Sequence, residues 1–206
     1  MNSENKNHWY DGHFYDKIIA PNQDKAFKIV KSLIANNSSI LDAGCGTGRL
    51  VFQCKDKSNK IAGIDLSIKN IKIAKRLLSK NNLPNISFYH ADLISYLKNN
   101  KVHFDYSVVS YVIHEVDENQ REKFIRTLSE SSDRIIIVDY LYPRPKSFAS
   151  ILNEAVEFAA GREHYKNYKS YLSNKGIMGI AEITGLKVES EIKNSPLSCH
   201  IVVLKK

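Results

Sequence analysis

A glycine-rich segment preceded by an aspartate is the part of this 206-residue sequence that points most clearly to ligand chemistry. The segment reads DAGCGTG over residues 42–48, after the apolar pair Ile40-Leu41. Glycines between a strand and a helix permit a tight turn and let a ligand approach the backbone at the helix N-terminus. Arg49 stands where a dinucleotide-binding fingerprint has its third glycine, and the GK[ST] ending of a phosphate-binding P-loop is absent. A carboxylate at Asp42 would repel a pyrophosphate but would suit an ammonium group, so the loop favours a nucleoside-like ligand without phosphates.

Two further aspartates, Asp65 and Asp92, follow the next two strand-like segments. Asp65 lies 21 residues after Gly44, where an acidic side chain accepts hydrogen bonds from ribose hydroxyls in nucleotide-binding α/β folds. Each aspartate alone could instead cap the helix that follows it. Three carboxylates at three successive strand ends, beside a glycine loop, favour a ligand site at the carboxyl edge of a sheet.

The elements that must position these residues alternate between strand-like and helix-like apolar spacing, which is typical of a parallel α/β sheet. Residues 141–185 then hold two helical patterns around Gly161, although one crossover helix would suffice. The last two strand-like runs are joined by a turn at residues 194–196, which predicts a hairpin at the sheet edge. The expected strands cover residues 40–42, 60–65, 86–89, 104–110, 134–140, 186–193 and 198–204.

The composition fits one soluble domain spanning residues 1–206. No apolar run approaches the ~20 residues of a membrane helix, and residues 1–17 lack the apolar core of a signal peptide, so we expect a cytoplasmic protein. The net charge of +8 raises the possibility of nucleic-acid binding, but basic and acidic residues are interspersed without a basic run, so a solvated lysine-rich surface is favoured.

The cysteines and histidines give no sign of a metal site. The three cysteines show no CxxC spacing, and the seven histidines include no HxxxH or HExxH pair. We therefore expect no metal, and the odd number of cysteines argues against a complete disulfide framework.

Four segments together resemble the successive motifs of class I S-adenosylmethionine-dependent methyltransferases. They are ILDAGCGTGRL, GIDLS, HADL and FDYSVVSYVIHEV, in that order between Ile40 and Asp139. The resemblance implies a Rossmann-like, doubly wound seven-stranded sheet, mostly parallel with an antiparallel last strand and helices on both faces. It also implies S-adenosylmethionine as cofactor and S-adenosylhomocysteine as product. Residues 1–36 would form an N-terminal lid and helix, 37–140 the cofactor-binding core, 141–185 a helical cap inserted after strand five, and 186–206 the terminal hairpin.

The resemblance also places residues around the cofactor. Residues 42–48 would cradle its methionine part, Asp65 would bind the ribose, Leu66 would pack on the adenine, and Asp92 would accept from the adenine amino group. The N-terminal HWYDGHFYDKI resembles the lead segment of quinone C-methyltransferases, in which an aromatic residue near Tyr15 covers the cofactor, although these aromatic residues could equally pack on the first helix. The full set implied is Tyr15, Asp42, Ala43, Gly44, Cys45, Gly46, Gly48, Asp65, Leu66, Asp92, Leu93 and Ser110.

Methyl transfer from a sulfonium is an in-line displacement, so positioning is the enzyme's main contribution, and a base is needed only for a protonated acceptor. His114 and Tyr111, just after the fourth strand, are the candidate catalytic residues, although His114 could equally be structural. The long insertion after strand five suggests a substrate pocket, although aromatic residues at helical spacing are more often part of a core. Its candidate substrate-binding residues are Glu157, His164, Tyr165 and Tyr168.

Features of related families that are absent favour a small-molecule acceptor. The fourth strand is followed by Ser110 and Tyr111-Val112-Ile113 instead of an NPPY-type tetrad, and no cysteine ends that strand. Both absences disfavour methylation of nucleic-acid bases. The alternatives are an RNA or protein methyltransferase that uses the basic surface, a non-catalytic S-adenosylmethionine-binding module, and a dinucleotide oxidoreductase.

Overall fold

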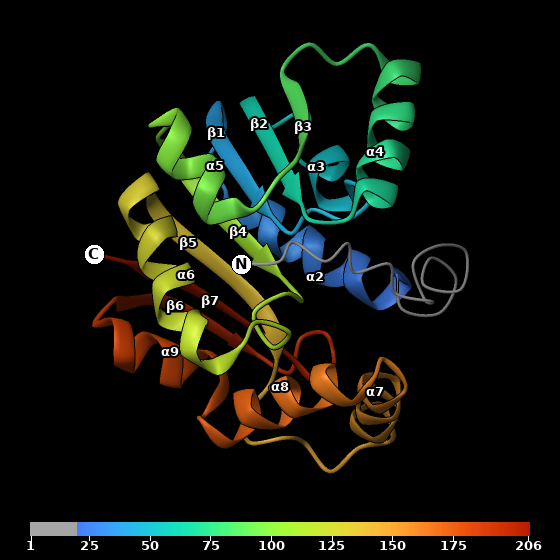
Figure 1. Cartoon of the computed structure of the whole chain (residues 1–206), viewed down its shortest axis with the longest axis vertical. Helices are drawn as coiled ribbons and strands as arrows, with labels where there is room; N and C mark the ends of the chain where they lie inside the picture. The colour runs from blue at the N-terminus through green and yellow to red at the C-terminus, as the bar shows by residue number, and fades with distance from the viewer. Residues whose placement is uncertain (1–19) are drawn as a thin grey trace.

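The computed structural model describes residues 20–206, which form one seven-stranded sheet covered by helices on both faces (Figure 1). The strands are β1 (Ser38–Ala43), β2 (Ser58–Asp65), β3 (Ile86–His90), β4 (Phe104–Ser110), β5 (Ser132–Tyr140), β6 (Lys187–Lys193) and β7 (Cys199–Lys205). Their order is β3-β2-β1-β4-β5-β7-β6. Only β7 runs antiparallel to its neighbours β5 and β6, which confirms the expected doubly wound sheet with an antiparallel last strand.

Alternation along the strands divides the core into two apolar layers. Ile40 and Ile136 face one layer, whereas their chain neighbours Leu41 and Ile137 face the other. The first layer is covered by α2 (Ala20–Leu33), α3 (Arg49–Gln53) and α4 (Ile68–Asn81), and the second by α5 (Leu93–Asn100), α6 (Glu118–Ser131) and α9 (Gly176–Thr184). Because both faces are covered, the parallel strands are apolar on both sides, and polar groups gather at the strand ends.

The segment between β5 and β6 contains three helices, one more than the sequence pattern indicates. Its first two helices, α7 (Phe148–Ala159) and α8 (Arg162–Ser173), lie beyond the carboxyl end of β5 (Figure 1). The third, α9, packs Ile177 and Ile180 against the sheet and so belongs to the body of the fold. Within residues 20–206, no helix is both long and apolar enough to cross a membrane.

A buried arginine fixes α8 to the body. Arg121, on α6, donates from Nε to the carbonyl oxygen of Val116 at 3.0 Å and from Nη2 to that of Asn167 at 2.6 Å. Its Nη1 donates to Ser170 Oγ at 3.2 Å. One guanidinium therefore joins the loop before α6 to two positions on α8, and its removal would leave buried carbonyl oxygens without donors.

We predict that Arg121→Met lowers the free energy of unfolding by about 2–4 kcal/mol, because two buried carbonyl groups lose charged donors. Arg126→Met is the matched control on the same helix, since Arg126 is half-exposed and pairs with Glu122 at 2.8 Å. The control is expected to cost less than about 1 kcal/mol. Urea denaturation of both variants measures the difference, and equal losses would contradict the anchoring role of Arg121.

Candidate functional site at the carboxyl edge of the sheet

The glycine loop between β1 and α3 has three left-handed glycines, with φ values of 81° at Gly44, 53° at Gly46 and 85° at Gly48. A Cβ atom at Gly44 would lie 2.4 Å from Val112 Cγ2, so this glycine is required for close packing against the loop after β4. A Cβ atom at Gly46 would meet nothing within 4 Å. The backbone at Gly46 therefore borders open space that a ligand could enter.

Asp65 ties this loop to the end of β2. Its Oδ2 accepts from the Gly46 N–H at 2.8 Å, and its Oδ1 accepts from the Ser67 N–H at 2.7 Å. Burial raises the pKa of Asp65, while these two backbone donors act in the opposite direction. Each carboxylate oxygen keeps acceptor capacity after one such bond. Leu66, directly beside it, is 53% exposed.

Asp42 lies behind the glycine loop and is only 2% exposed. Its Oδ1 is buried and has no hydrogen-bond partner within the described part of the chain. Burial raises the pKa of Asp42 to about 8, and the nearby Asp65 charge adds to the shift. A cationic group placed close to Asp42 would favour its ionised form, because opposite charge offsets the cost of burying a carboxylate.

The other expected cofactor positions fall at the same edge, apart from one outside residues 20–206. Asp92 caps α5, because its Oδ1 accepts from the N–H of Ser95 at 2.9 Å and from its Oγ at 2.7 Å. Asp92 therefore acts as the helix cap that the sequence analysis gave as the alternative to ligand binding. Its side chain is nevertheless exposed at the carboxyl end of β3. Leu93 is buried beside it, and Ser110 ends β4 half-buried. Tyr15 lies outside the described residues.

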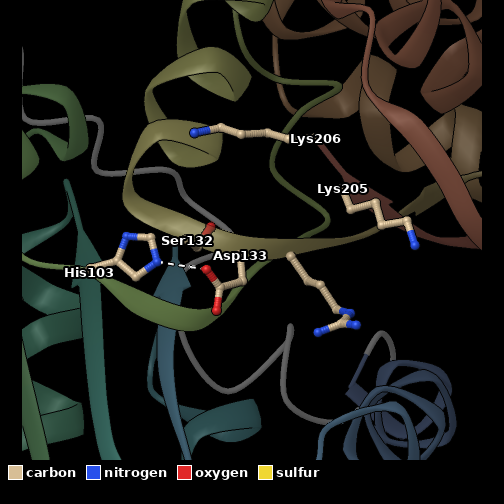
Figure 2. Close-up of a pocket in the computed structure, with 6 residues that line it drawn as sticks. His103, Ser132, Asp133, Lys205 and Lys206 are labelled. Atoms are coloured by element: carbon tan, nitrogen blue, oxygen red, sulfur yellow. Dashed lines mark hydrogen bonds and ion pairs between the residues drawn. The ribbon is translucent and has the colours of Figure 1, made fainter.

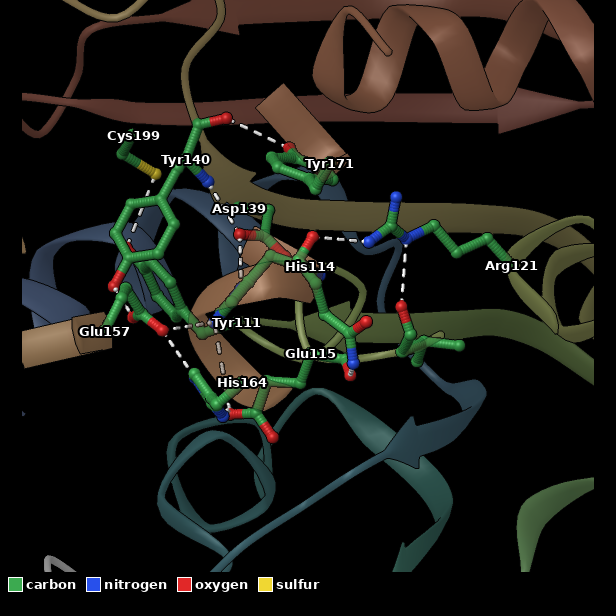
Figure 3. A network of polar contacts seen from close by, with 12 residues as sticks. Tyr111, His114, Glu115, Arg121, Asp139, Tyr140, Glu157, His164, Tyr171 and Cys199 are labelled. Carbon is green, nitrogen blue, oxygen red and sulfur yellow. Dashed lines mark hydrogen bonds and ion pairs between the residues drawn. The ribbon is translucent and has the colours of Figure 1, made fainter. Parts of the chain in front are cut away.

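A second group of polar side chains lies beyond β4 and β5, where α7 and α8 approach (Figure 3). His114 Nδ1 lies 2.7 Å from Asp139 Oδ1, and both side chains are buried. His114 Nε2 lies 3.5 Å from Glu157 Oε2, which also contacts His164 Nε2. Tyr140 donates its hydroxyl to Glu157 Oε1 at 2.6 Å. We call His114, Asp139, Tyr140, Glu157 and His164 the polar network.

The charges of the polar network hold His114 in its protonated form. Burial opposes protonation, but the Asp139 and Glu157 carboxylates outweigh it and raise the pKa of His114 well above its usual value. The pKa of Glu157 is lowered, because the two imidazoles outweigh the effect of its burial. A protonated imidazole cannot accept a proton from an acceptor molecule. The network as it stands therefore disfavours His114 as the general base.

The candidate substrate residues divide into two groups. Tyr168 is buried and places its ring 6.2 Å from that of His114, so it joins Glu157 and His164 beside the polar network. Tyr165 instead donates to Glu154 Oε1 at 2.9 Å and lies outside the network. Tyr111 has a left-handed φ of 55° and directs its hydroxyl to Cys199 Sγ at 3.5 Å.

Sequence reasoning missed Asp139 and Tyr140. Both come at the end of β5, where the run IIIV is followed by Asp139 and Tyr140. The signal was an acidic residue directly after a buried strand, which is the same signal that identified Asp42 and Asp65. The side chain of Asp139 is completely buried, and the His114 imidazole is the polar partner that this buried carboxylate needs.

A shallow hollow lies at the other end of the strands, away from the glycine loop (Figure 2). It lies where β4 and β5 begin, and four of its charged groups form ion pairs. His103 Nε2 contacts Asp133 Oδ1 at 2.8 Å, while Arg134 and Lys205 both contact Glu189. Ligands of open α/β sheets bind at the carboxyl ends of the strands, so this hollow is not the candidate site.

Comparison with known proteins supports the expected resemblance. Residues 40–132 match a family described as a methyltransferase domain. Over the described residues, the fold is similar to the crystal structure of magnesium protoporphyrin IX methyltransferase from Synechocystis PCC 6803 with bound S-adenosylhomocysteine. That similarity has a TM-score of 0.67 at 17% identity and covers 95% of this chain and 88% of that one. Residues 40–132 thus match a methyltransferase domain, and the resemblance to class I S-adenosylmethionine-dependent methyltransferases is confirmed.

Two curated relatives match shorter parts of the chain. An uncharacterized RNA methyltransferase from Mycoplasma mobile is 30% identical over 80 residues, which cover 39% of this chain and 22% of that protein. A release factor glutamine methyltransferase from Buchnera aphidicola is 26% identical over 141 residues, which cover 64% of this chain and 51% of that protein. The chain therefore spans at most about half the length of these two relatives.

We predict that Asp42→Asn flattens the pH dependence of stability. Because the folded-state pKa of Asp42 is raised to about 8, its contribution to the free energy of unfolding is fully present below about pH 4 and is lost as the pH rises toward 8. Between pH 5 and pH 7 the native chain should lose up to about 1.4 kcal/mol per pH unit that the variant does not lose.

Urea denaturation at several pH values, without added ligand, measures these slopes. Asp56→Asn is the control, because Asp56 is exposed and its pKa is lowered by Lys31. The control should keep the slope of the native chain. Identical slopes for the native chain and Asp42→Asn would show that Asp42 is ionised throughout this range.

Proposed function

We propose that this chain is a methyltransferase that uses S-adenosylmethionine to methylate a small-molecule acceptor. The observation that carries the proposal is the glycine loop, whose open Gly46 position is joined to Asp65 by a 2.8 Å hydrogen bond at the carboxyl edge of the sheet. The methyltransferase-domain match, residues 40–132, covers this loop and the helix α3 that follows it.

The residues at this edge fit the chemistry of the proposed cofactor. Asp42 offers a buried carboxyl with an unpartnered oxygen, which suits the ammonium of the methionine part. Asp65 keeps acceptor capacity for ribose hydroxyls, and the exposed Leu66 side chain offers an apolar surface for the adenine. Asp92 and the backbone of Leu93 would lie at the adenine amino group.

Further cofactor contacts would come from the loop itself and from β4. The backbone of residues 43–48 would lie along the methionine part, including Ala43, Cys45 and the three glycines, and Ser110 would approach it from the end of β4. When bound, S-adenosylmethionine supplies an electrophilic methyl group on a sulfonium. The chain's own residues orient the cofactor and the acceptor and exclude water, which can contribute roughly 7–11 kcal/mol through effective molarity.

The acceptor would approach from the side of α7 and α8, because these helices lie beyond the carboxyl end of β5 (Figure 1) and carry Glu157 and His164 of the polar network (Figure 3). His164 and Tyr168 face that region from α8, and Glu157 faces it from α7. Tyr111, after β4, would position the acceptor or its reacting group. This combination of polar and aromatic side chains suits a small molecule.

An RNA or protein acceptor is the second candidate, because the two curated relatives carry those names. The hollow lined by Arg134, Lys205 and Lys206 lies at the opposite edge of the sheet, so its basic residues are not placed beside the glycine loop (Figure 2). This arrangement favours the small-molecule acceptor.

A methyl-transfer screen tests both acceptor classes. The chain is incubated with methyl-labelled S-adenosylmethionine and separate metabolite, RNA and protein fractions, and formation of S-adenosylhomocysteine is measured. We expect turnover with the metabolite fraction. Turnover only with RNA or protein would overturn the acceptor class, and calorimetric binding without turnover in any fraction would indicate a non-catalytic binding module.

We predict that Gly46→Ala weakens S-adenosylmethionine binding at least tenfold, because the new methyl group would occupy the space proposed for the ligand. Its left-handed φ should also cost about 1–2 kcal/mol of stability. Gly185→Ala is the matched control, since Gly185 has φ 70° and equally open surroundings at the end of α9. The control should lose similar stability but keep its affinity by calorimetry. Equal affinities in the two variants would contradict the proposed cofactor position.

A further inference from the structure

Four potential metal ligands meet where the loop after β4 contacts α7 and α8. They are His114, Glu115, Glu157 and His164, which we call the His–Glu cluster. Nε2 of His114, a carboxylate oxygen of Glu115 and a ring nitrogen of His164 all lie within 4.8 Å of one another. Glu157 Oε2 lies 3.5 Å from His114 Nε2 and also contacts His164 Nε2. We propose that the His–Glu cluster binds one divalent transition-metal ion.

The spacing of the ligand atoms suits such an ion. Zinc bonds of about 2.0–2.2 Å in a tetrahedral arrangement separate ligand atoms by about 3.3–3.6 Å. The Glu115 Oε1 atom lies 4.0 Å from Nε2 of both His114 and His164, and the His114–Glu157 separation is 3.5 Å. Shifts of a few tenths of an ångström bring these three pairs to bonding distance around one centre. Glu157 Oε2 and His164 Nε2 now contact each other directly, so these two atoms must move further apart to admit the ion.

Two of the four ligands are already oriented by outer partners. Asp139 holds Nδ1 of His114 at 2.7 Å, which directs Nε2 into the cluster. Tyr140 donates to Oε1 of Glu157, which directs Oε2 to the same point. Carboxylates and hydroxyls behind the ligands are typical of metal sites, where they fix the ring orientation and the ligand geometry.

A buried carboxylate and the charge balance support the same conclusion. Glu157 is only 4% exposed, and its Oε2 lies against the Nε2 atoms of both imidazoles. The bound ion would displace the His114 proton to solvent. The two carboxylates and two neutral imidazoles then carry a charge of −2, which a divalent cation neutralises. The mixed nitrogen and oxygen donors suit zinc or a neighbouring transition metal better than calcium or magnesium.

A hydrogen bond from a side chain to the backbone also joins the two segments that carry the cluster. Asn167, on α8, donates from Nδ2 to the carbonyl oxygen of Glu115 at 2.8 Å. The loop that carries His114 and Glu115 is thereby fixed to the helix that carries His164. The sequence gives no sign of this site, because His114 and His164 are 50 residues apart and no short metal-binding motif contains them. The inference therefore departs from the expectation of no metal.

Zinc binding to the purified chain tests the proposal directly. The tag-free protein is treated with a chelator, dialysed and titrated with Zn²⁺ against a chromophoric competitor, and Co²⁺ substitution reports coordination through its visible absorbance. We expect one saturable ion per chain. Failure of the native chain to bind Zn²⁺ saturably would overturn the proposal, whatever the outcome of the methyl-transfer screen.

Two ligand variants and one control locate the ion. His164→Gln and Glu115→Gln should each weaken Zn²⁺ binding at least tenfold and alter the Co²⁺ spectrum. Glu115 is half-exposed, so its variant should fold even if His164→Gln does not, and circular dichroism checks both. His103→Gln is the control, because His103 is exposed and pairs with Asp133 at the opposite edge of the sheet. Unchanged affinity in Glu115→Gln and in a folded His164→Gln would overturn the assignment.

Discussion

The 2.7 Å contact between His114 and Asp139 is the interaction on which the carboxyl edge of this fold depends. Asp139 lies near the end of β5, and His114 lies in the loop after the neighbouring β4. The contact therefore joins this loop to the end of β5. Both side chains are buried, and breaking such a pair by removing one partner costs about 3–5 kcal/mol. Glu157 and His164 then extend the contact to α7 and α8. A charge network that begins inside the sheet therefore links both helices to the strand ends, in addition to the Arg121 contacts of α8.

The same edge collects carboxylates, because the ends of parallel strands all lie there. Each aspartate has a different partner. Asp65 accepts two backbone N–H groups, Asp139 faces an imidazole, and Asp42 keeps one buried oxygen without a hydrogen bond. Although the whole chain carries a net charge of +8, buried acidic groups gather behind the glycine loop. A cationic ligand would relieve this concentration of acidic groups, as the proposed cofactor does.

How far the sequence predicts this structure depends on whether each signal is local. The glycine loop, the parallel strands and the terminal hairpin follow from short patterns of glycine and apolar residues, and the architecture they predict is confirmed. The division of residues 141–185 into three helices is less visible. Lys175 adopts a left-handed φ of 63° just before α9, and nothing about a lysine predicts that conformation.

The contacts of the polar network could not be predicted from the sequence, because its residues are distant in the chain. Asp139 lies 25 residues after His114, and Glu157 lies 43 residues after it. The sequence identified His114, Glu157 and His164 as candidates from their residue types and positions. It could not indicate that they contact one another, since that depends on how the helices pack after β5. Asp139 carried a usable signal, because a charged residue at the end of an apolar strand must find a partner when it is buried.

The two attachments of α8 differ in how they respond to a bound ligand. Arg121 holds the helix through the carbonyl oxygen of Asn167 and the hydroxyl of Ser170, so this attachment involves no carboxylate of the site. His164 and Glu157 instead contact His114 through charged groups that a bound cation would reorganise. The helix would stay in place while its site-facing side chains change partners. Arg121 can therefore keep α8 fixed while the His164 side chain on that helix adjusts to the ligand.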